Sequence, residues 1–133
     1  MKKIDFFKLQ AKNLCRDFKT QKCGSDGVYL YFPKYFPDID DLIVSFDIDE
    51  DHFSLMKAQH LIAYLAGFKT WSELLHASDE ALELGELLLN NRNRFNSPLR
   101  ENWDMYLEQN GMQNSADESK LEVFKIVFLN IPC

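Results

Sequence analysis

The sequence predicts a mainly α-helical fold: a compact bundle of about five helices, with a short two-stranded β-ribbon possible within residues 28–48. Apolar residues recur at helical spacing along most of the chain, and turn-forming residues separate the segments in which they do so. The 133 residues are 46% apolar and 14% aromatic, which is enough to bury a core within one domain. We therefore expect residues 1–133 to form a single helical domain, with a core of residues 4–76 followed by C-terminal helices within 78–130.

Residues 4–20 are predicted to form the first helix. Its apolar positions share one side: Phe7, Ala11, Leu14 and Phe18. Four basic residues fall within about 80° of one another at ~100° per residue. They form a compact stripe beside the apolar side: Lys8, Lys12, Arg16 and Lys19. The turn-forming run Gly-Ser-Asp-Gly at residues 24–27 ends this element.

Residues 28–53 allow two interpretations. Residues 28–32 and 42–48 are rich in β-branched and aromatic residues, which favours two short strands with Pro33 and Pro37 between them. The alternative is a short helix that begins near Asp38, with the preceding aromatic residues in a packed loop. We expect the ribbon.

Residues 54–76 have the signals of two helices joined at a glycine. Apolar residues at i, i+3, i+4 and i+7 form one stripe: Ala58, Leu61, Ile62 and Leu65. Gly67 follows the last turn, where a left-handed residue closes a helix without steric cost. Thr70 and Glu73 match a capping box, which predicts the start of the second helix.

Three more helices are predicted in the C-terminal part. Ser78 caps the first, which runs through Asn90 and is followed by a polar linker at residues 90–96. Ser97 is the predicted N-cap of the second, with Pro98 at its first helical position, and Gly111 stops that helix. The third begins near Ser115 and ends before Pro132. The apolar positions expected inside are Leu82, Leu84, Leu87 and Leu88, then Leu99, Trp103, Tyr106 and Leu107, then Leu121, Phe124 and Phe128.

Two segments resemble the small bacterial glyoxalase-related helical domain. The longer pattern is Ala58-x-x-Leu61-Ile62-Ala63-x-x-x-Gly67-Phe68-x-x-Trp71-x-x-Leu74, and the upstream helix has the similar Ala11-Lys12-Asn13-Leu14. The resemblance covers residues 6–20 and 52–76, about a third of the chain. It implies a helical domain that occurs alone or beside glyoxalase-like modules and has no established catalytic site of its own.

No catalytic or metal-binding pattern emerges from the spacing of reactive residues. The acidic stretch of residues 38–51 fails the calcium-loop pattern, because the glycine and the final glutamate of that pattern are missing. His52 and His60 with Asp49 or Asp51 are the best metal candidates, yet eight residues separate the histidines, about two helical turns. Cys15, Cys23 and Cys133 are odd in number and lack the C-x-x-C spacing of a zinc site. We therefore assign no catalytic, cofactor-binding or metal-binding residues, and an enzyme whose site assembles from distant residues stays open.

Charge is segregated along the chain, whose net charge is −6. Residues 1–34 have eight Lys or Arg against three Asp, a net of +5, so that the remainder carries −11. Such segregation favours binding to another macromolecule, and the negative total disfavours DNA.

The expected function is therefore a non-enzymatic, cytoplasmic domain that binds another protein and does not enter a membrane. The candidate interaction surface comprises Lys8, Lys12, Arg16, Lys19, Tyr29, Tyr31, Tyr35 and Phe36. One alternative is association with nucleic acid through the basic first helix. Another is a metal-assisted enzyme, or an accessory domain of glyoxalase-like proteins. The oligomeric state is left open, a homodimer included.

Overall fold

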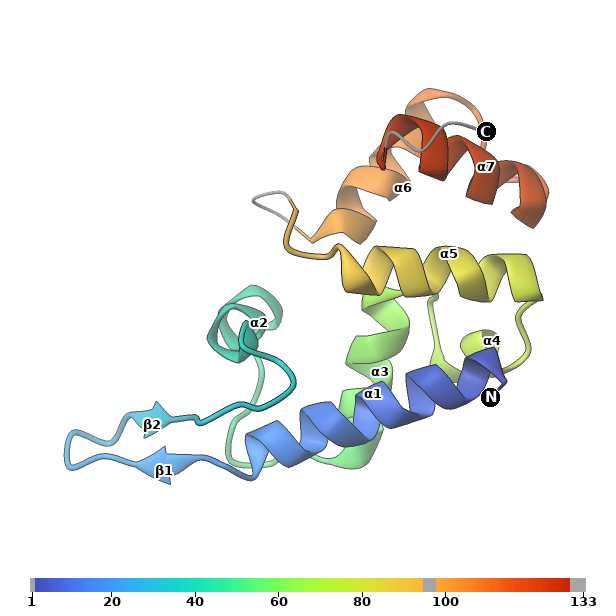
Figure 1. Ribbon diagram of the computed structural model, residues 1–133. Coiled ribbons are helices and arrows are strands. Elements are labelled where there is room, and N and C mark those ends of the chain that lie inside the picture. Colours follow the sequence, from blue (N-terminus) through green and yellow to red (C-terminus); the bar gives the residue numbers. More distant parts are fainter. Residues whose placement is uncertain (1, 95–97, 130–133) are drawn as a thin grey trace. The chain divides into compact units, whose positions relative to one another are not determined.

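The computed structural model describes residues 2–94 and 98–129, and within these ranges the protein is mainly helical (Figure 1). Seven helices and one two-stranded antiparallel sheet lie in the described ranges. In chain order the elements are α1 (Lys3–Phe18), β1 (Lys22–Cys23), β2 (Tyr29–Leu30), α2 (Ile39–Phe46), α3 (Leu55–Leu65), α4 (Trp71–Leu75), α5 (Asp79–Asn90), α6 (Leu99–Gln109) and α7 (Asp117–Val127). The predicted fold class, helices with a short ribbon, is confirmed.

The chain divides into two units. The ribbon unit, residues 8–61, contains most of α1, both strands, α2 and the first part of α3. The α5 unit, residues 1–7 and 62–133, contains the start of α1, the end of α3 and α4–α7.

One of the two predicted strands forms, since β2 lies within residues 28–32, but its partner is β1 rather than residues 42–48. Lys22 pairs with Leu30 and Cys23 with Tyr29, so the turn-forming run of residues 24–27 is the hairpin loop rather than only the end of the first helix. The loop closes because Gly24 N–H donates to the Val28 carbonyl (2.9 Å) and Gly27 adopts φ +80°.

The prediction of a strand at residues 42–48 is wrong, and the alternative helix near Asp38 is correct. Residues 39–46 form α2, and Asp38 is its N-cap. Ile39 and Leu42, three residues apart, are buried together on one side of this helix. Tertiary burial thus overrides the β-propensity of Ile43 and Val44. Asp47, with φ 49°, ends the helix, and its N–H donates to the Ile43 carbonyl.

The glycine between α3 and α4 acts as predicted. Gly67 adopts φ +93°, its N–H donates to the Tyr64 carbonyl (3.0 Å), and Phe68 N–H donates to the Ala63 carbonyl (2.9 Å). These two bonds are those of a Schellman motif, which satisfies the last carbonyls of a helix. Thr70 Oγ1 then accepts from Glu73 N–H at 3.0 Å and caps α4.

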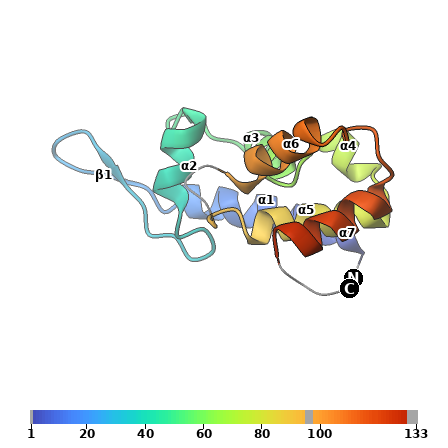
Figure 2. The same ribbon diagram turned by 90° about the horizontal axis from the view of Figure 1, so that it is seen from above.

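The core of the α5 unit lies among α5, α6 and α7, and Figures 1 and 2 show α7 alongside α5. Its buried residues are Leu84, Leu88, Leu99, Trp103, Leu107, Leu121 and Phe124. Trp103 contacts Phe124 edge to face, with ring centroids 5.1 Å apart. At the surface, Lys125 Nζ lies 2.8 Å from Glu83, and Lys3 Nζ lies 4.0 Å from it. The hydrogen bond from Lys125 lowers the pKa of the Glu83 carboxyl.

The predicted C-terminal helices are present, with shifted ends. Ser78 Oγ accepts from Ala81 N–H at 3.1 Å and caps α5, as expected. Pro98 occupies the N-cap of α6 rather than its first helical position. The predicted cap Ser97 and the chain end from Asn130, with Pro132 and Cys133, lie outside the described residues. Over the described ranges, no helix has the length and apolar content to cross a bilayer.

Candidate interaction surface

One face of the β-ribbon is attached to the rest of the ribbon unit, and we call it the inner face (Tyr29 and Tyr31). Tyr31 Oη donates to Glu50 Oε1 at 2.8 Å and accepts from Gln21 Nε2 at 3.0 Å. Tyr29 Oη donates to Asp51 Oδ1. The Tyr31 ring also contacts Phe18 edge to face, with centroids 5.4 Å apart. Hydrogen bonds and ring packing therefore fix the inner face onto α1 and the segment before α3.

The two phenols have raised pKa values for different reasons. Burial raises the pKa of Tyr31, and the hydrogen bond to Glu50 raises it further. For Tyr29 the largest cause of the raised pKa is the hydrogen bond to Asp51. Both phenols are therefore neutral donors at physiological pH, which suits bonds to carboxylates.

Asp17 holds the chain segment that follows β2. Its side chain is 1% exposed. The two carboxylate oxygens accept from the backbone N–H groups of Lys34 (2.9 Å), Tyr35 (2.9 Å) and Phe36 (2.6 Å). Nearby, Thr20 Oγ1 accepts from Phe32 N–H at 2.9 Å. Asp17 near the end of α1 thus fixes residues 34–36 through charge-assisted hydrogen bonds, and the hydroxyl of Thr20, just after α1, holds Phe32.

The opposite side of the ribbon is apolar and exposed, and we call it the outer face (Lys22, Val28, Leu30 and Phe32). Successive side chains of a strand point to opposite sides, so Val28, Leu30 and Phe32 share the side opposite Tyr29 and Tyr31. Their exposed fractions are 56%, 58% and 60%. Lys22 is the pairing partner of Leu30, and its Nζ lies 5.4 Å from the centre of the Phe32 ring. Where an exposed strand face is normally polar, this one is apolar with a cation at its border.

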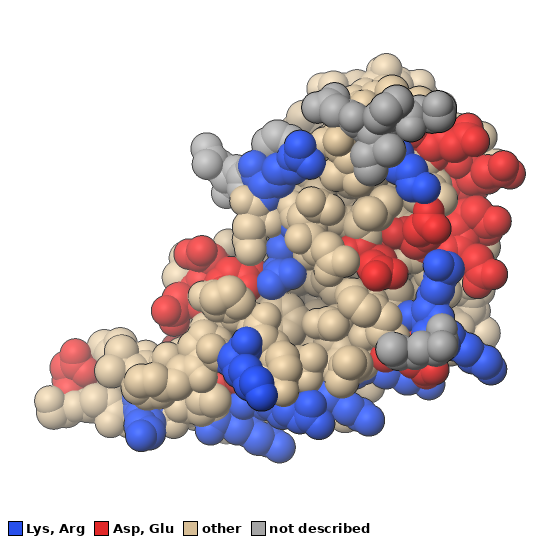
Figure 3. Space-filling model, viewed as in Figure 1, with Lys and Arg blue, Asp and Glu red and all other residues tan. Residues whose placement is uncertain are grey.

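Basic side chains continue this surface along α1. The basic stripe (Lys8, Lys12, Arg16 and Lys19) is exposed along its whole length. Figure 3 shows Lys and Arg side chains gathered along the edge of the ribbon unit that α1 and the ribbon form. Beyond the ribbon, Lys34 Nζ lies 5.4 Å from the centre of the Tyr35 ring, which is 40% exposed.

The structure separates the eight predicted surface residues into three groups. The four basic residues and Tyr35 are exposed, as a binding surface requires. Tyr29 and Tyr31 are half-buried on the inner face. Phe36 is 1% exposed, so the prediction that it belongs to an interaction surface is wrong, because Asp17 turns its backbone towards the core.

The predicted surface lacks the three apolar residues of the outer face, Val28, Leu30 and Phe32, and also Lys22. The signal of the three apolar residues was present as the alternation of residues 28–32, since every second residue of a strand faces the same way. An alternation in which both sets of side chains are apolar or aromatic does not tell which set faces outward.

The candidate metal ligands do not assemble into a site. His52 Nδ1 lies 2.8 Å from Asp49 Oδ2, and both side chains are exposed. The hydrogen bond with His52 lowers the pKa of the Asp49 carboxyl. Among the residues that the structure describes, no group of three or more His, Cys, Asp and Glu side chains is placed to hold a metal ion.

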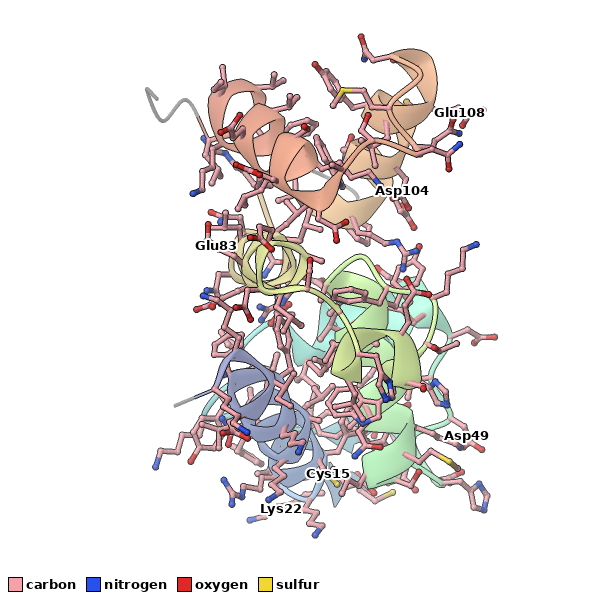
Figure 4. The ribbon with its side chains drawn as sticks, turned by 90° about the vertical axis from the view of Figure 1, so that its right-hand side faces the viewer. Cys15, Lys22, Asp49, Glu83, Asp104 and Glu108 are labelled. Carbon is pink, nitrogen blue, oxygen red and sulfur yellow. The ribbon has the colours of Figure 1, made fainter. Side chains whose placement is uncertain are left out.

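A crevice in the α5 unit is the other candidate site. It measures about 140 Å³, and buried Phe68, Leu84 and Trp103 contribute to its lining. Two of the three carboxylates that line it have partners within the fold: Asp104 Oδ2 lies 2.9 Å from Arg100 Nε, and Asp117 Oδ2 accepts from Ser78 Oγ at 2.7 Å. Figure 4 shows Asp104 and Glu108 on the same side of α6, and Glu83 on the other side of this unit. Among the described residues that line the crevice, there is no Ser, Thr or Cys nucleophile and no His base.

Comparison with known proteins identifies no relative. No family model matches the chain, and neither a curated protein nor a solved structure matches it. Any functional proposal for this chain therefore depends on its own residues and their geometry.

Proposed function

We propose that this chain is a non-enzymatic domain that binds another protein through the outer face of its β-ribbon. The observation that supports the proposal is the exposure of Val28, Leu30 and Phe32 on one side of a ribbon whose other side is anchored. Covering the exposed half of each such side chain is worth about 1 kcal/mol. Large apolar groups in contiguous exposed positions are typical of protein-binding sites.

The attachment of the ribbon by hydrogen bonds supports the same proposal. The hydrogen bonds of the inner-face tyrosines, and the three that backbone N–H groups donate to Asp17, hold the outer face in position before a partner binds. A preorganised surface loses less conformational entropy on binding than a mobile one. The resemblance of residues 6–20 and 52–76 to a domain without an established catalytic site agrees with a binding role. The free thiols Cys15 and Cys23 agree with a cytoplasmic location, which we include in the proposal.

Affinity capture with matched variants tests this proposal. The purified chain and its Leu30→Ser/Phe32→Ser variant are immobilised, and the proteins captured from a lysate of the source cells are identified by mass spectrometry. The control is Val44→Ser, which changes a side chain that is 82% exposed on α2 and lies outside the ribbon. We expect a partner that the wild type and the control retain and the ribbon variant loses at least about tenfold. Equal capture by the ribbon variant would contradict the proposal.

A second candidate, nucleic-acid association through α1, is favoured by the exposed basic stripe. It predicts that Lys12→Glu/Arg16→Glu weakens binding to labelled DNA and lowers the salt slope by about one for each phosphate that the protein no longer neutralises. Fluorescence anisotropy over a range of salt concentrations measures both effects. Absence of binding at low salt would exclude this candidate.

A further inference from the structure

The ribbon separates opposite charges onto its two sides. Its inner face is bonded to the carboxylates Glu50 and Asp51. Its outer face has the ammonium group of Lys22 beside Phe32. Figure 4 shows Lys22 and Asp49 at separate edges of the ribbon unit. The outer face is therefore flanked by positive charge, while the nearby carboxylates are engaged on the other side.

The two carboxylates within residues 8–34 do not offset the positive charge of this segment. Asp17 is buried and accepts three backbone N–H groups. Asp26 lies in the hairpin loop and accepts from Val28 N–H at 3.1 Å. Against these, six exposed cations lie in residues 8–34: Lys8, Lys12, Arg16, Lys19, Lys22 and Lys34. A partner that covers the outer face gains most if it brings carboxylates beside its apolar groups.

The apolar groups themselves favour a protein segment over a single-stranded nucleic acid. Val28 and Leu30 are aliphatic and offer no ring on which a base can stack. The two exposed rings, Phe32 and Tyr35, each have an ammonium group 5.4 Å from the ring centre. An ammonium group over a ring competes with a base for that face of the ring.

We propose that the outer face binds an acidic segment of another protein, in which Leu or Phe side chains contact Val28, Leu30 and Phe32 while neighbouring carboxylates pair with Lys22 and Lys34. This inference rests on the proposed function and specifies the chemistry of the partner. Steering by the basic stripe on α1 would speed the encounter and make it salt-dependent.

Three labelled probes test the inference by fluorescence anisotropy with the full chain. Two are short peptides with the same Leu and Phe positions, which differ only in having Glu or Gln between them. The third is an oligothymidine of similar length. We expect the Glu peptide to bind at least about tenfold more tightly than the Gln peptide, with this preference lost at high salt.

Charge variants test whether the preference for the Glu peptide arises at the outer face. Lys22→Glu/Lys34→Glu should weaken binding of the Glu peptide at least about tenfold, whereas Lys22→Arg/Lys34→Arg should preserve it. The control Lys57→Glu/Lys69→Glu makes the same change in net charge at two other exposed lysines and should leave binding unchanged. Circular dichroism of each variant shows whether the fold is retained.

Each other result overturns the inference. If the Gln peptide binds as tightly as the Glu peptide, the partner is not selected by charge, and the protein-binding function stands. If oligothymidine binds more tightly than the Glu peptide, and Lys22→Glu/Lys34→Glu weakens the binding of oligothymidine, the surface is a nucleic-acid site. If wild type binds no probe at millimolar concentration, the acidic-segment inference fails. Failure of the proposed function is seen separately, as unchanged lysate capture by Leu30→Ser/Phe32→Ser.

Discussion

At the scale of single residues, Asp17 holds together two segments of the ribbon unit that are far apart in the sequence. Its carboxylate accepts hydrogen bonds from the backbone N–H groups of Lys34, Tyr35 and Phe36, which follow it in the sequence by 17 to 19 positions. A buried carboxylate must be paired with donors, and here the donors are backbone amides of a loop. The path from the ribbon to α2 therefore depends on this side chain.

Replacing Asp17 with Asn should destabilise the protein by about 2–3 kcal/mol, because an amide has one acceptor oxygen where the carboxylate has two. Urea unfolding measures the free energy, and hydrogen exchange at the amides of residues 34–36 shows whether the loss is local. The control Asp26→Asn changes an exposed carboxylate with one bond and should cost less than about 1 kcal/mol. Equal effects of the two variants would contradict this role of Asp17.

The Tyr31 hydroxyl should stabilise the protein in a way that depends on pH. Because the pKa of Tyr31 is raised in the fold above its usual value near 10, the folded state keeps the phenolic proton when the unfolded state loses it. The stabilisation is therefore complete below about pH 10 and is lost as the pH rises through the raised pKa.

Comparison of wild type with Tyr31→Phe over this pH range measures the effect. The variant keeps the ring against Phe18 and should be less stable by about 1 kcal/mol at neutral pH. The difference should shrink above about pH 10. Tyr35→Phe removes an exposed hydroxyl and serves as the control. If the difference in free energy of unfolding between the two proteins stays constant to high pH, the hydrogen bond between the phenol and the carboxylate does not contribute to stability.

At the scale of the elements, the turn between α3 and α4 requires glycine for two reasons. Gly67 has φ +93°, and a Cβ built on it would lie 3.0 Å from Leu88 Cδ1. Gly111, which ends α6, has φ +65° with no atom within 4 Å of its Cβ position among the described residues. The two positions share a left-handed backbone and differ in the space around it.

Gly67→Ala should therefore destabilise the protein more than Gly111→Ala. The backbone conformation alone costs about 1–2 kcal/mol in each variant. At position 67 the contact with Leu88 adds to this cost, since α5 would have to move or Leu88 change rotamer. Thermal unfolding of both variants gives the comparison, and a larger effect at position 111 would contradict the steric argument.

The element that sequence reasoning misjudged, α2, shows the limit of propensity. Residues 42–48 look like a strand because Ile43 and Val44 are β-branched. The deciding feature is the burial of Ile39 and Leu42 on one side, with Val44 left 82% exposed. A helix has the spacing that buries the first two together, which a strand does not.

At the scale of the whole molecule, both units bury apolar side chains, and the ribbon unit adds side-chain hydrogen bonds that attach the ribbon. In the α5 unit, an apolar cluster around Leu88 and Trp103 joins α5, α6 and α7. In the ribbon unit, the ribbon is attached by side-chain hydrogen bonds of residues such as Asp17 and Tyr31. A large-to-small substitution in the apolar cluster should therefore cost more stability than the loss of one ribbon hydrogen bond, such as that of the Tyr31 hydroxyl.

Leu88→Ala should lower the free energy of unfolding by about 2–5 kcal/mol, because Leu88 is 1% exposed and the cavity left behind would not fill completely. Tryptophan fluorescence during urea unfolding, measured in a Trp71→Phe background, reports on this core through Trp103. Met105→Ala, at a side chain that is 57% exposed on α6, should change stability by less than about 0.5 kcal/mol. Similar losses in both variants would argue against this core.

Sequence alone determined the helical fold class, the apolar sides of α1, α3, α5, α6 and α7, and the turns at Gly67 and Thr70. These features depend on residues within one or two helical turns of each other, so their signals are local. Tertiary structure alone decided the strand pairing, the helical state of residues 39–46, the burial of Asp17 and Phe36, and the outward direction of Val28, Leu30 and Phe32. Each of these depends on partners far along the chain, and a strand's alternation shows that two faces exist without showing which one the core will cover.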